Sequence, residues 1–128
     1  MVKLSEEVYT LPQPSDLIDS QTIEMLKEVA ESTARERVRL CLHQGTEEPV
    51  HEMLIVHPRD AYVPPHKHLK KSETILILSG HCDYFIFSET GEIESQITLR
   101  PYNEGGNFIF RLGEPLYHSL LIHSEQLV

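Results

Sequence analysis

The chain has 128 residues, of which 40% are apolar and 24% charged, and this composition suits one globular domain with its own core. Its formal net charge of −9 disfavours nucleic-acid binding, because an acidic surface repels phosphate backbones. No apolar run approaches the roughly 20 residues that cross a bilayer, and Glu6 and Glu7 interrupt the stretch where a signal peptide is apolar. We therefore expect a cytoplasmic protein with no membrane partner. Its thiols, Cys41 and Cys82, are then reduced, although a disulfide between them is an alternative.

The N-terminal part of the chain predicts one amphipathic helix. Pro12 and Pro14 end an irregular segment, and residues 15–34 contain neither glycine nor proline. Apolar side chains recur at helical spacing in this stretch, at Ile23, Leu26, Val29 and Ala30. Asp19 or Ser20 can cap the helix by accepting from its first free backbone amides. The apolar stripe must cover a surface, so we expect the helix outside a β-structure, on one sheet or on a partner subunit.

From Glu36 onward, short alternating runs separated by turn residues predict antiparallel strands. The eight runs are residues 37–43, 50–57, 61–65, 73–78, 81–87, 92–100, 107–112 and 117–123. Gly91 suits a hairpin loop that needs a positive φ, and residues 125–128 begin to look like another strand. This pattern predicts a sandwich or barrel. We expect an N-terminal arm and helix at residues 1–34, packed on a β-barrel at residues 35–128.

Several of the predicted strands are apolar on both faces, notably within residues 75–78 and 84–87. A small barrel has one interior, so its outer apolar faces must meet the helix, another sheet or another subunit. We expect a homodimer. The alternative is that the N-terminal helix alone covers these faces.

Two histidines and a glutamate are spaced as ligands for one divalent metal. On a strand, His66 and His68 project side by side from one face. The four residues that follow suffice for a turn, after which Glu73 opens the next run, and Gly80 ends that run where a turn needs no side chain. Without the metal, the histidine pair would be surface or packing residues. His51, His57, His81 and His123 are interpreted as ordinary surface or turn residues.

The order HxH, four residues, Glu, six residues, Gly resembles the first motif of the cupin superfamily. Asp60 stands where that motif usually begins with glycine. The segment 113–118, Gly-Glu-Pro-Leu-Tyr-His, resembles the second motif, with its proline and glycine exchanged and Ile122 in place of a frequent asparagine. The resemblance implies an all-β fold, the cupin-type double-stranded β-helix or jelly-roll barrel, here with an N-terminal α-helix. It also implies four metal ligands: His66, His68, Glu73 and His118.

Within this superfamily, residues 35–123 are similar to the small single-domain cupin metalloproteins of the WbuC type. The similarity lies in residues 39–43, Glu52-Met53, Pro65 to His68, residues 71–73 and the later histidine. Such proteins are often associated with surface-polysaccharide gene clusters. This association implies a sugar-related small molecule and identifies no reaction.

Three neutral imidazoles and one carboxylate suit a divalent transition metal such as Fe(II), Mn(II), Ni(II) or Zn(II). Four protein ligands on an octahedral ion leave two positions for water or substrate. One anionic ligand leaves the site with a formal charge of about +1. Such a site favours a small-molecule ligand that is anionic or polyhydroxylated, despite the acidic chain.

Three further residues are candidates for catalysis. Arg39 and His43 share one face of a predicted strand, where Arg39 can bind an anionic substrate and His43 can exchange protons. Tyr62 precedes the first ligand by four residues and can donate a hydrogen bond to a bound oxygen. The alternatives are a surface arginine, a hydrogen-bonded histidine and a buried aromatic side chain.

The sequence thus predicts a metal-binding cupin, and foremost a metal-dependent isomerase, epimerase or lyase acting on a small polar, sugar-derived molecule in polysaccharide-related metabolism. One alternative is a non-haem iron dioxygenase, in which oxygen and substrate occupy adjacent positions. Another is a module that binds metal and a small ligand without turnover.

Overall fold

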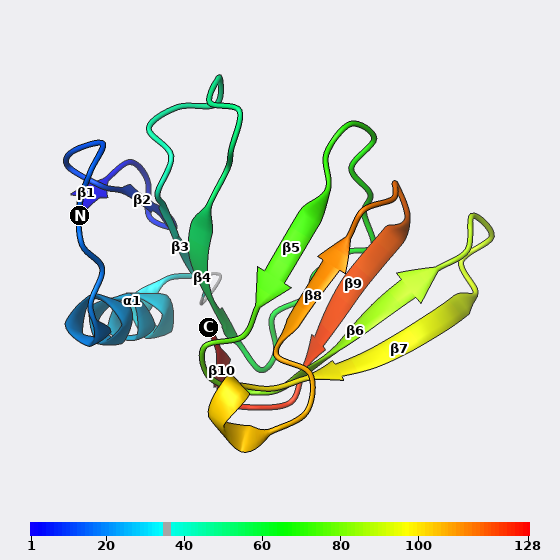
Figure 1. Cartoon of the computed structure of the whole chain (residues 1–128). Coiled ribbons are helices and arrows are strands. Elements are labelled where there is room, and N and C mark those ends of the chain that lie inside the picture. Colours follow the sequence, from blue (N-terminus) through cyan, green and yellow to red (C-terminus); the bar gives the residue numbers. More distant parts are fainter. Residues whose placement is uncertain (35–36) are drawn as a thin grey trace. The chain divides into compact units, whose positions relative to one another are not determined.

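Ten short strands and one α-helix form the regular structure of the described part of the chain (Figure 1). The computed structural model describes residues 1–34 and 37–128. These residues form two compact units, the first made of residues 1–61 with Val128 and the second of residues 62–127. The fold is mainly β with one helix, as the sequence predicts.

Helix α1, Ser20–Ser32, begins and ends at residues with extended backbone. Asp19 accepts a hydrogen bond from the backbone N–H of Thr22 at 2.9 Å, which confirms one of the two predicted caps. At the other end, the backbone N–H and the hydroxyl of Thr33 both donate to the carbonyl oxygen of Ala30. The helix is shorter than the predicted stretch of residues 15–34 because these capping bonds end its hydrogen-bond ladder on both sides.

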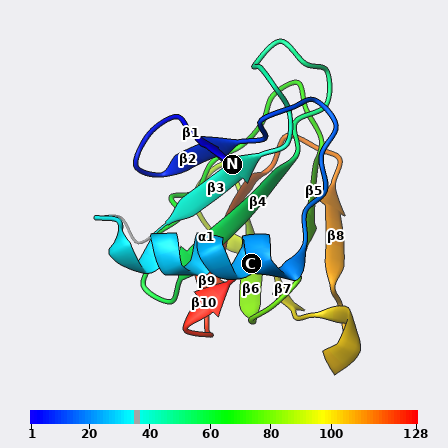
Figure 2. The same ribbon diagram turned by 90° about the vertical axis from the view of Figure 1, so that its left-hand side faces the viewer.

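One face of α1 packs across strands β3 and β4 (Figure 2). Leu26 and Ala30 are buried there, together with Val38, Leu40 and Val56 of the two strands. Fully burying a leucine contributes about 1.5–3 kcal/mol. The predicted stripe of the helix therefore faces the core of the first unit.

In the first unit, β2 runs parallel to β3, whereas β1 is antiparallel to β2 and β4 is antiparallel to β3. The strands are β1 Val2–Lys3, β2 Val8–Thr10, β3 Val38–Cys41 and β4 Met53–Pro58. The N-terminal segment was expected to be irregular, and β1 and β2 correct this expectation. Strands of two and three residues are too short to give a detectable alternation of apolar residues.

In the second unit, β5 pairs with β8, and β6 lies between β7 and β9, all antiparallel. The elements are β5 Glu73–Leu76, β6 Cys82–Phe87, β7 Ile93–Leu99, the 3-10 helix η1 Tyr102–Glu104, β8 Ile109–Leu112, β9 Tyr117–Ile122 and β10 Gln126–Leu127. Gly80 and Gly91 both have a φ of +87° in the turns where the sequence predicts a glycine. The final strand, expected within residues 125–128, is also present.

The strand predicted at residues 61–65 is not formed. Pro64 and Pro65 have no backbone N–H, so this segment cannot complete a ladder of hydrogen bonds. His66 instead makes a single antiparallel bridge with His118, with backbone N–H to oxygen distances of 3.1 and 2.9 Å. His66 and His68 therefore lie on a loop fixed at one point rather than on one strand.

The pairings within the described residues form separate sheets and not one continuous closed sheet. The strand pairings therefore show a mainly β fold, and they do not by themselves show a jelly-roll barrel. The predicted division into residues 1–34 and 35–128 falls next to residue 35, which lies outside the described residues, and it stays a prediction.

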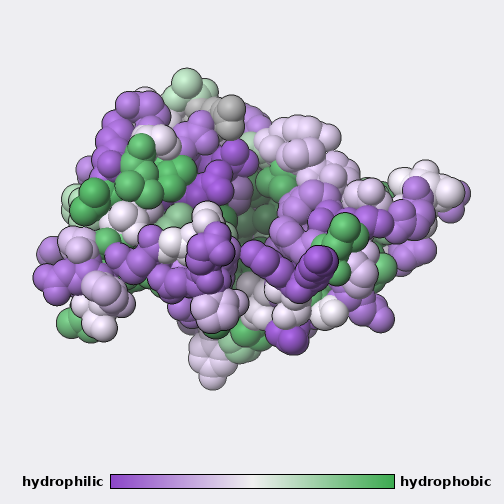
Figure 3. All heavy atoms as spheres, turned by 90° about the horizontal axis from the view of Figure 1, so that it is seen from above, coloured by the Kyte–Doolittle hydropathy of each residue, from purple (hydrophilic) through white to green (hydrophobic). Residues whose placement is uncertain are grey.

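Hydrophilic residues make up most of the surface in view in Figure 3, in line with the share of charged residues. Among the described residues, no helix is long and apolar enough to cross a membrane. Both cysteines are free thiols, with Cys41 partly buried and Cys82 buried.

Candidate metal centre

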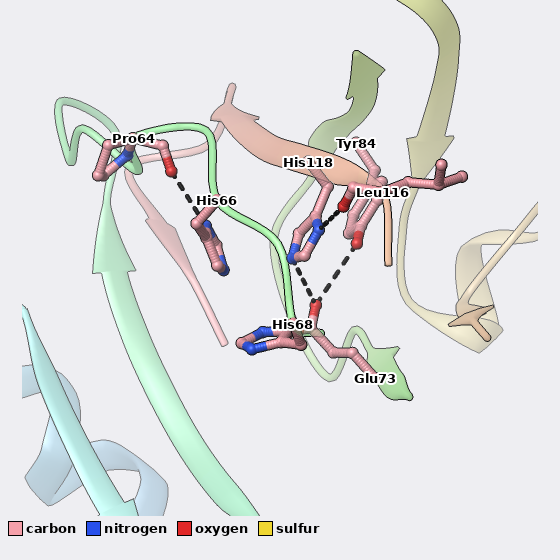
Figure 4. Close-up of polar contacts among 7 residues, drawn as sticks. All are labelled: Pro64, His66, His68, Glu73, Tyr84, Leu116 and His118. Carbon is pink, nitrogen blue, oxygen red and sulfur yellow. Dashed lines mark hydrogen bonds and ion pairs between the residues drawn. The ribbon is translucent and has the colours of Figure 1, made fainter. Parts of the chain in front are cut away.

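Four side chains of the second unit converge at one point (Figure 4). They come from the loop before β5 (His66 and His68), from the first residue of β5 (Glu73) and from β9 (His118). One nitrogen or oxygen atom from each residue lies within 4.8 Å of the others. Two ligands that each lie about 2.0–2.2 Å from one ion are at most about 4.4 Å apart, so a small contraction would bring all four into bonding distance.

The backbone fixes which ring nitrogen is available on two of the histidines. Nδ1 of His66 lies 3.0 Å from the carbonyl oxygen of Pro64, and Nδ1 of His118 lies 2.9 Å from that of Leu116. A carbonyl oxygen only accepts, so both Nδ1 atoms carry a proton and donate it. In the neutral rings, the lone pair is then on Nε2, as a metal ligand requires.

The carboxylate of Glu73 joins the other side chains. Its Oε2 atom lies 3.0 Å from Nε2 of His68, and its Oε1 atom lies 3.4 Å from Nε2 of His118. The hydroxyl of Tyr84 donates to the same Oε1 atom at 3.4 Å. Each carboxylate oxygen thus faces one imidazole.

These contacts shift the pKa values of the buried groups. The interaction with His118 lowers the pKa of Glu73 to about 2, with a further contribution from His68 and against the effect of burial. Burial acts to lower the pKa of His118, but the Glu73 carboxylate and the Leu116 carbonyl outweigh it, and the pKa is raised. Burial, and the nearby carboxylate, raise the pKa of Tyr84. At neutral pH, Glu73 is therefore ionised and Tyr84 keeps its proton.

Nε2 of His118 is buried and has no hydrogen-bond partner among the described residues. Its contact with Glu73 at 3.4 Å is an ion pair that lacks the geometry of a hydrogen bond. If the ring is neutral, its lone pair faces an ionised carboxylate, which is unfavourable. A cation at this point, either an added proton or a metal ion, removes the conflict, so the donor set fits a metal.

One side of the cluster is open to solvent. His118 is 2% exposed, whereas the side chains of His68 and Glu73 are 39% and 33% exposed. The buried histidine can anchor an ion while the more exposed ligands leave room for a small molecule.

Tyr84 is a residue of this site that the sequence did not reveal. It is 1% exposed, and its ring stacks on that of His118, with 5.5 Å between centroids and 7° between planes. In the sequence it is one aromatic residue in an apolar strand. Its place beside His118 depends on the pairing of β6 with β9, which the sequence pattern does not give.

The three predicted catalytic residues do not contact the four ligands in any hydrogen bond or ion pair of the described residues. Tyr62 is 76% exposed and lies outside the strands. Arg39 and His43 belong to the first unit, where Nδ1 of His43 donates to the carbonyl oxygen of Glu52 and its ring stacks on that of His51. Their roles in binding or proton transfer stay predictions.

Residues 18–99 match the model of a family described as Domain of unknown function (DUF6016), and the chain belongs to that family. The matched range contains His66, His68 and Glu73, whereas His118 follows it. Neither the comparison with curated proteins nor the comparison with solved structures gives a match.

Proposed function

We propose that this protein is a metal-binding cupin in which His66, His68, Glu73 and His118 hold one divalent transition metal. The convergence of their four ligand atoms within 4.8 Å supports this proposal most directly. Three imidazoles and a carboxylate suit Fe(II), Mn(II), Ni(II) or Zn(II), and their affinity order alone does not choose among these ions.

Metal analysis of the loaded protein tests the ligand set. Protein purified without an affinity tag is incubated anaerobically with each of the four ions, desalted and analysed, and we expect about one equivalent of at least one metal. Glu73→Gln and His118→Ala should lose most of this metal. Glu104→Gln is the matched control, because Glu104 pairs with the exposed imidazole of His81. Equal loading of all four proteins, or no loading with any ion, would refute the proposal.

The proposal includes a specific fold, the double-stranded β-helix or jelly-roll barrel. The antiparallel strands of the second unit and the positive φ of Gly80 at the end of the first motif support it. An experimental structure in which these strands do not form two facing sheets would exclude the jelly roll.

The proposed activity is that of a metal-dependent enzyme, an isomerase, epimerase or lyase, acting on a small polar, sugar-derived molecule in polysaccharide-related metabolism. A bound metal would polarise a carbonyl or hydroxyl oxygen. The partial exposure of His68 and Glu73 lets a small molecule reach the site. Turnover of anionic or polyhydroxylated sugars by the loaded protein, absent after chelation, tests this activity.

The sharper alternative is a non-haem iron dioxygenase, supported by a donor set that leaves two positions on an octahedral ion. Iron is loaded anaerobically, and oxygen uptake is then followed with candidate substrates. No uptake with any metal would remove the oxygenase.

The second alternative is a non-catalytic module that binds metal and a small ligand. One observation favours it: Tyr84, a titratable group in contact with the ligand cluster, has a raised pKa and cannot act as a base near neutral pH. Binding of a small ligand to the loaded protein, without turnover of that ligand, would support this alternative.

We further propose a cytoplasmic homodimer. Leu76 and Ile109 are partners in the β5–β8 pairing, so they share a face, and they are 46% and 48% exposed. A second subunit would remove this apolar surface from water. Light scattering should give twice the chain mass of 14.7 kDa, whereas a single chain mass at all concentrations would contradict the dimer.

A further inference from the structure

The sheet of the first unit has a cationic face. In the β3–β4 register, Val38 pairs with Val56 and Arg39 with Ile55. Arg37 directly precedes β3, and continuing this register by one residue sets it against His57. Paired residues, and residues two apart on a strand, share a face. Arg37, Arg39 and His57 therefore lie on one side of the sheet, and Val38, Leu40 and Val56 lie on the other, beneath α1.

The two guanidinium groups on this face have little compensating charge. Arg37 lies 3.8 Å from the carboxylate of Glu7, near the limit for an ion pair. Arg39 is half-buried, and within residues 1–34 and 37–128 its guanidinium has neither an ion pair nor a hydrogen bond. Removing part of a charged group from water is costly unless a partner compensates for its charge. The chain has 20 acidic residues, so the exposed surface offers many carboxylates that this arginine does not use.

His57 is not the surface or turn residue that the sequence interpretation expected. It lies within β4, and its Nδ1 atom is buried with no hydrogen-bond partner in the described part of the chain. Burial, together with the charges of Arg37 and Arg39, lowers its pKa to about 4. At neutral pH the ring is uncharged and can offer one N–H. Thr10, which belongs to the same face through its pairing with Cys41, also has a buried hydroxyl without a partner.

We propose that Arg37, Arg39 and His57 form a binding site for a small oxyanion, the phosphate or carboxylate group of a small molecule. Guanidinium groups bind such groups through two parallel hydrogen bonds. An oxyanion would supply the charge that Arg39 lacks and an acceptor for the imidazole N–H. The three residues belong to the first unit, whereas the four candidate metal ligands belong to the second.

An NMR titration that follows the imidazole signals of His57 tests the site in the full chain. One arm adds inorganic phosphate, a second adds acetate, and a third adds chloride at matched ionic strength. Each runs to about 10 mM, ten times a Kd of about 1 mM. We expect a saturable shift with phosphate, acetate or both, and none with chloride. No saturable shift with either oxyanion, or the same shift with chloride, would overturn the proposal.

Two variants separate this site from general attraction of anions. Arg39→Gln should weaken oxyanion binding about tenfold or more, because it removes the charged fork. Arg111→Gln removes the same charge from an exposed position on β8 and should leave binding unchanged. If Arg39→Gln does not fold, Arg39→Lys replaces it, which keeps the charge and loses the bidentate geometry. Equal affinity in the Arg39 variant and the wild type, or equal weakening by both substitutions, contradicts the site.

Discussion

Glu73 links the side chains of the candidate metal centre to one another. Its two carboxylate oxygens face different histidines, and one of them also accepts a hydrogen bond from Tyr84. The spacing of the sequence could predict Glu73 and the two nearby histidines as ligands, since they lie within eight residues of one another. It could not predict Tyr84 or the burial of His57. Both follow from which strand pairs with which, and a side chain's neighbours across a sheet leave no periodic signal in the chain.

At this scale, we predict that Tyr84→Phe weakens metal binding while the fold is kept. The hydroxyl donates to Glu73, and the loss of such an outer partner of a ligand typically costs about 10–100-fold in metal affinity. Competition with a chromophoric chelator for Zn(II) measures the affinity. Urea unfolding should show a loss of only about 0.5–1.5 kcal/mol, as for one hydrogen bond.

Tyr102→Phe is the control for this change. Tyr102 is 77% exposed, so this substitution also removes a tyrosine hydroxyl, but from the surface. Unchanged Zn(II) affinity in the Tyr84 variant would show that the hydroxyl does not orient Glu73.

At the scale of elements, the sequence predicted strands where alternating runs are long and failed where local chemistry interrupts them. Prolines 64 and 65 removed the strand that was to carry His66, because they take two donors from the ladder. The loop still delivers His66 to the site, because one backbone bridge to His118 replaces a strand. The ligand set could therefore be predicted although the element that carries it could not.

Gly80 lies in a turn that is packed closely against residues 124–127. A Cβ atom at Gly80 would overlap the carbonyl oxygen of Gln126 and the hydroxyl of Ser124, whereas one at Gly91 would meet nothing within 4 Å. Both glycines have a φ of +87°, so alanine is strained at both, on the order of 1 kcal/mol. Gly80→Ala should therefore be more destabilising than Gly91→Ala, by about 1–3 kcal/mol. Urea unfolding of the two variants measures the difference, and equal midpoints would show that the 124–127 segment moves away freely.

Asp83 connects three elements of the second unit. It is 8% exposed and accepts hydrogen bonds from Gln96 and Thr98 of β7 and from His123 after β9, at 2.8–2.9 Å. Burial acts to raise its pKa, but these three bonds outweigh it, and the pKa of Asp83 is lowered. Its folded pKa is then below the unfolded value of about 3.9. The stabilisation is present above that pH and is lost as the pH falls through the folded pKa.

We therefore predict a destabilisation by Asp83→Asn that depends on pH. At pH 7, it should cost about 1.5–3 kcal/mol, the range for hydrogen bonds to a charged group. At about pH 3, below the unfolded pKa, the difference from the wild type should be smaller. Glu94→Gln, at an exposed position on β7, should stay within about 0.5 kcal/mol at both pH values. Unfolding free energies that differ equally at both pH values would mean that the charge of Asp83 is not what stabilises the sheet.

At the scale of the whole molecule, the spacing of apolar residues could predict a mainly β chain with one helix, because it changes from helical to alternating after residue 34. The sequence did not reveal the two compact units, because a difference in composition does not by itself mark a boundary, even though residues 62–127 hold eight of the nine aromatic residues. Val128 joins the core of the first unit although it follows the last strand of the second. Such long-range contacts are decided by packing and not by local pattern.

The position of all four ligands within residues 62–127 predicts that metal binding stabilises the folded chain. An unfolded chain does not hold these side chains together, so the ion binds only the folded state. It then adds about 2.7 kcal/mol to the free energy of unfolding at a free concentration of 100 times its Kd, and about 4.1 kcal/mol at 1,000 times. The melting temperature should rise with the logarithm of the free Zn(II) concentration. His118→Ala should abolish most of this rise, because it removes the most buried ligand. His81→Ala should keep it, because His81 pairs with Glu104 at the surface. The same rise in both variants would mean that Zn(II) stabilises the chain from elsewhere.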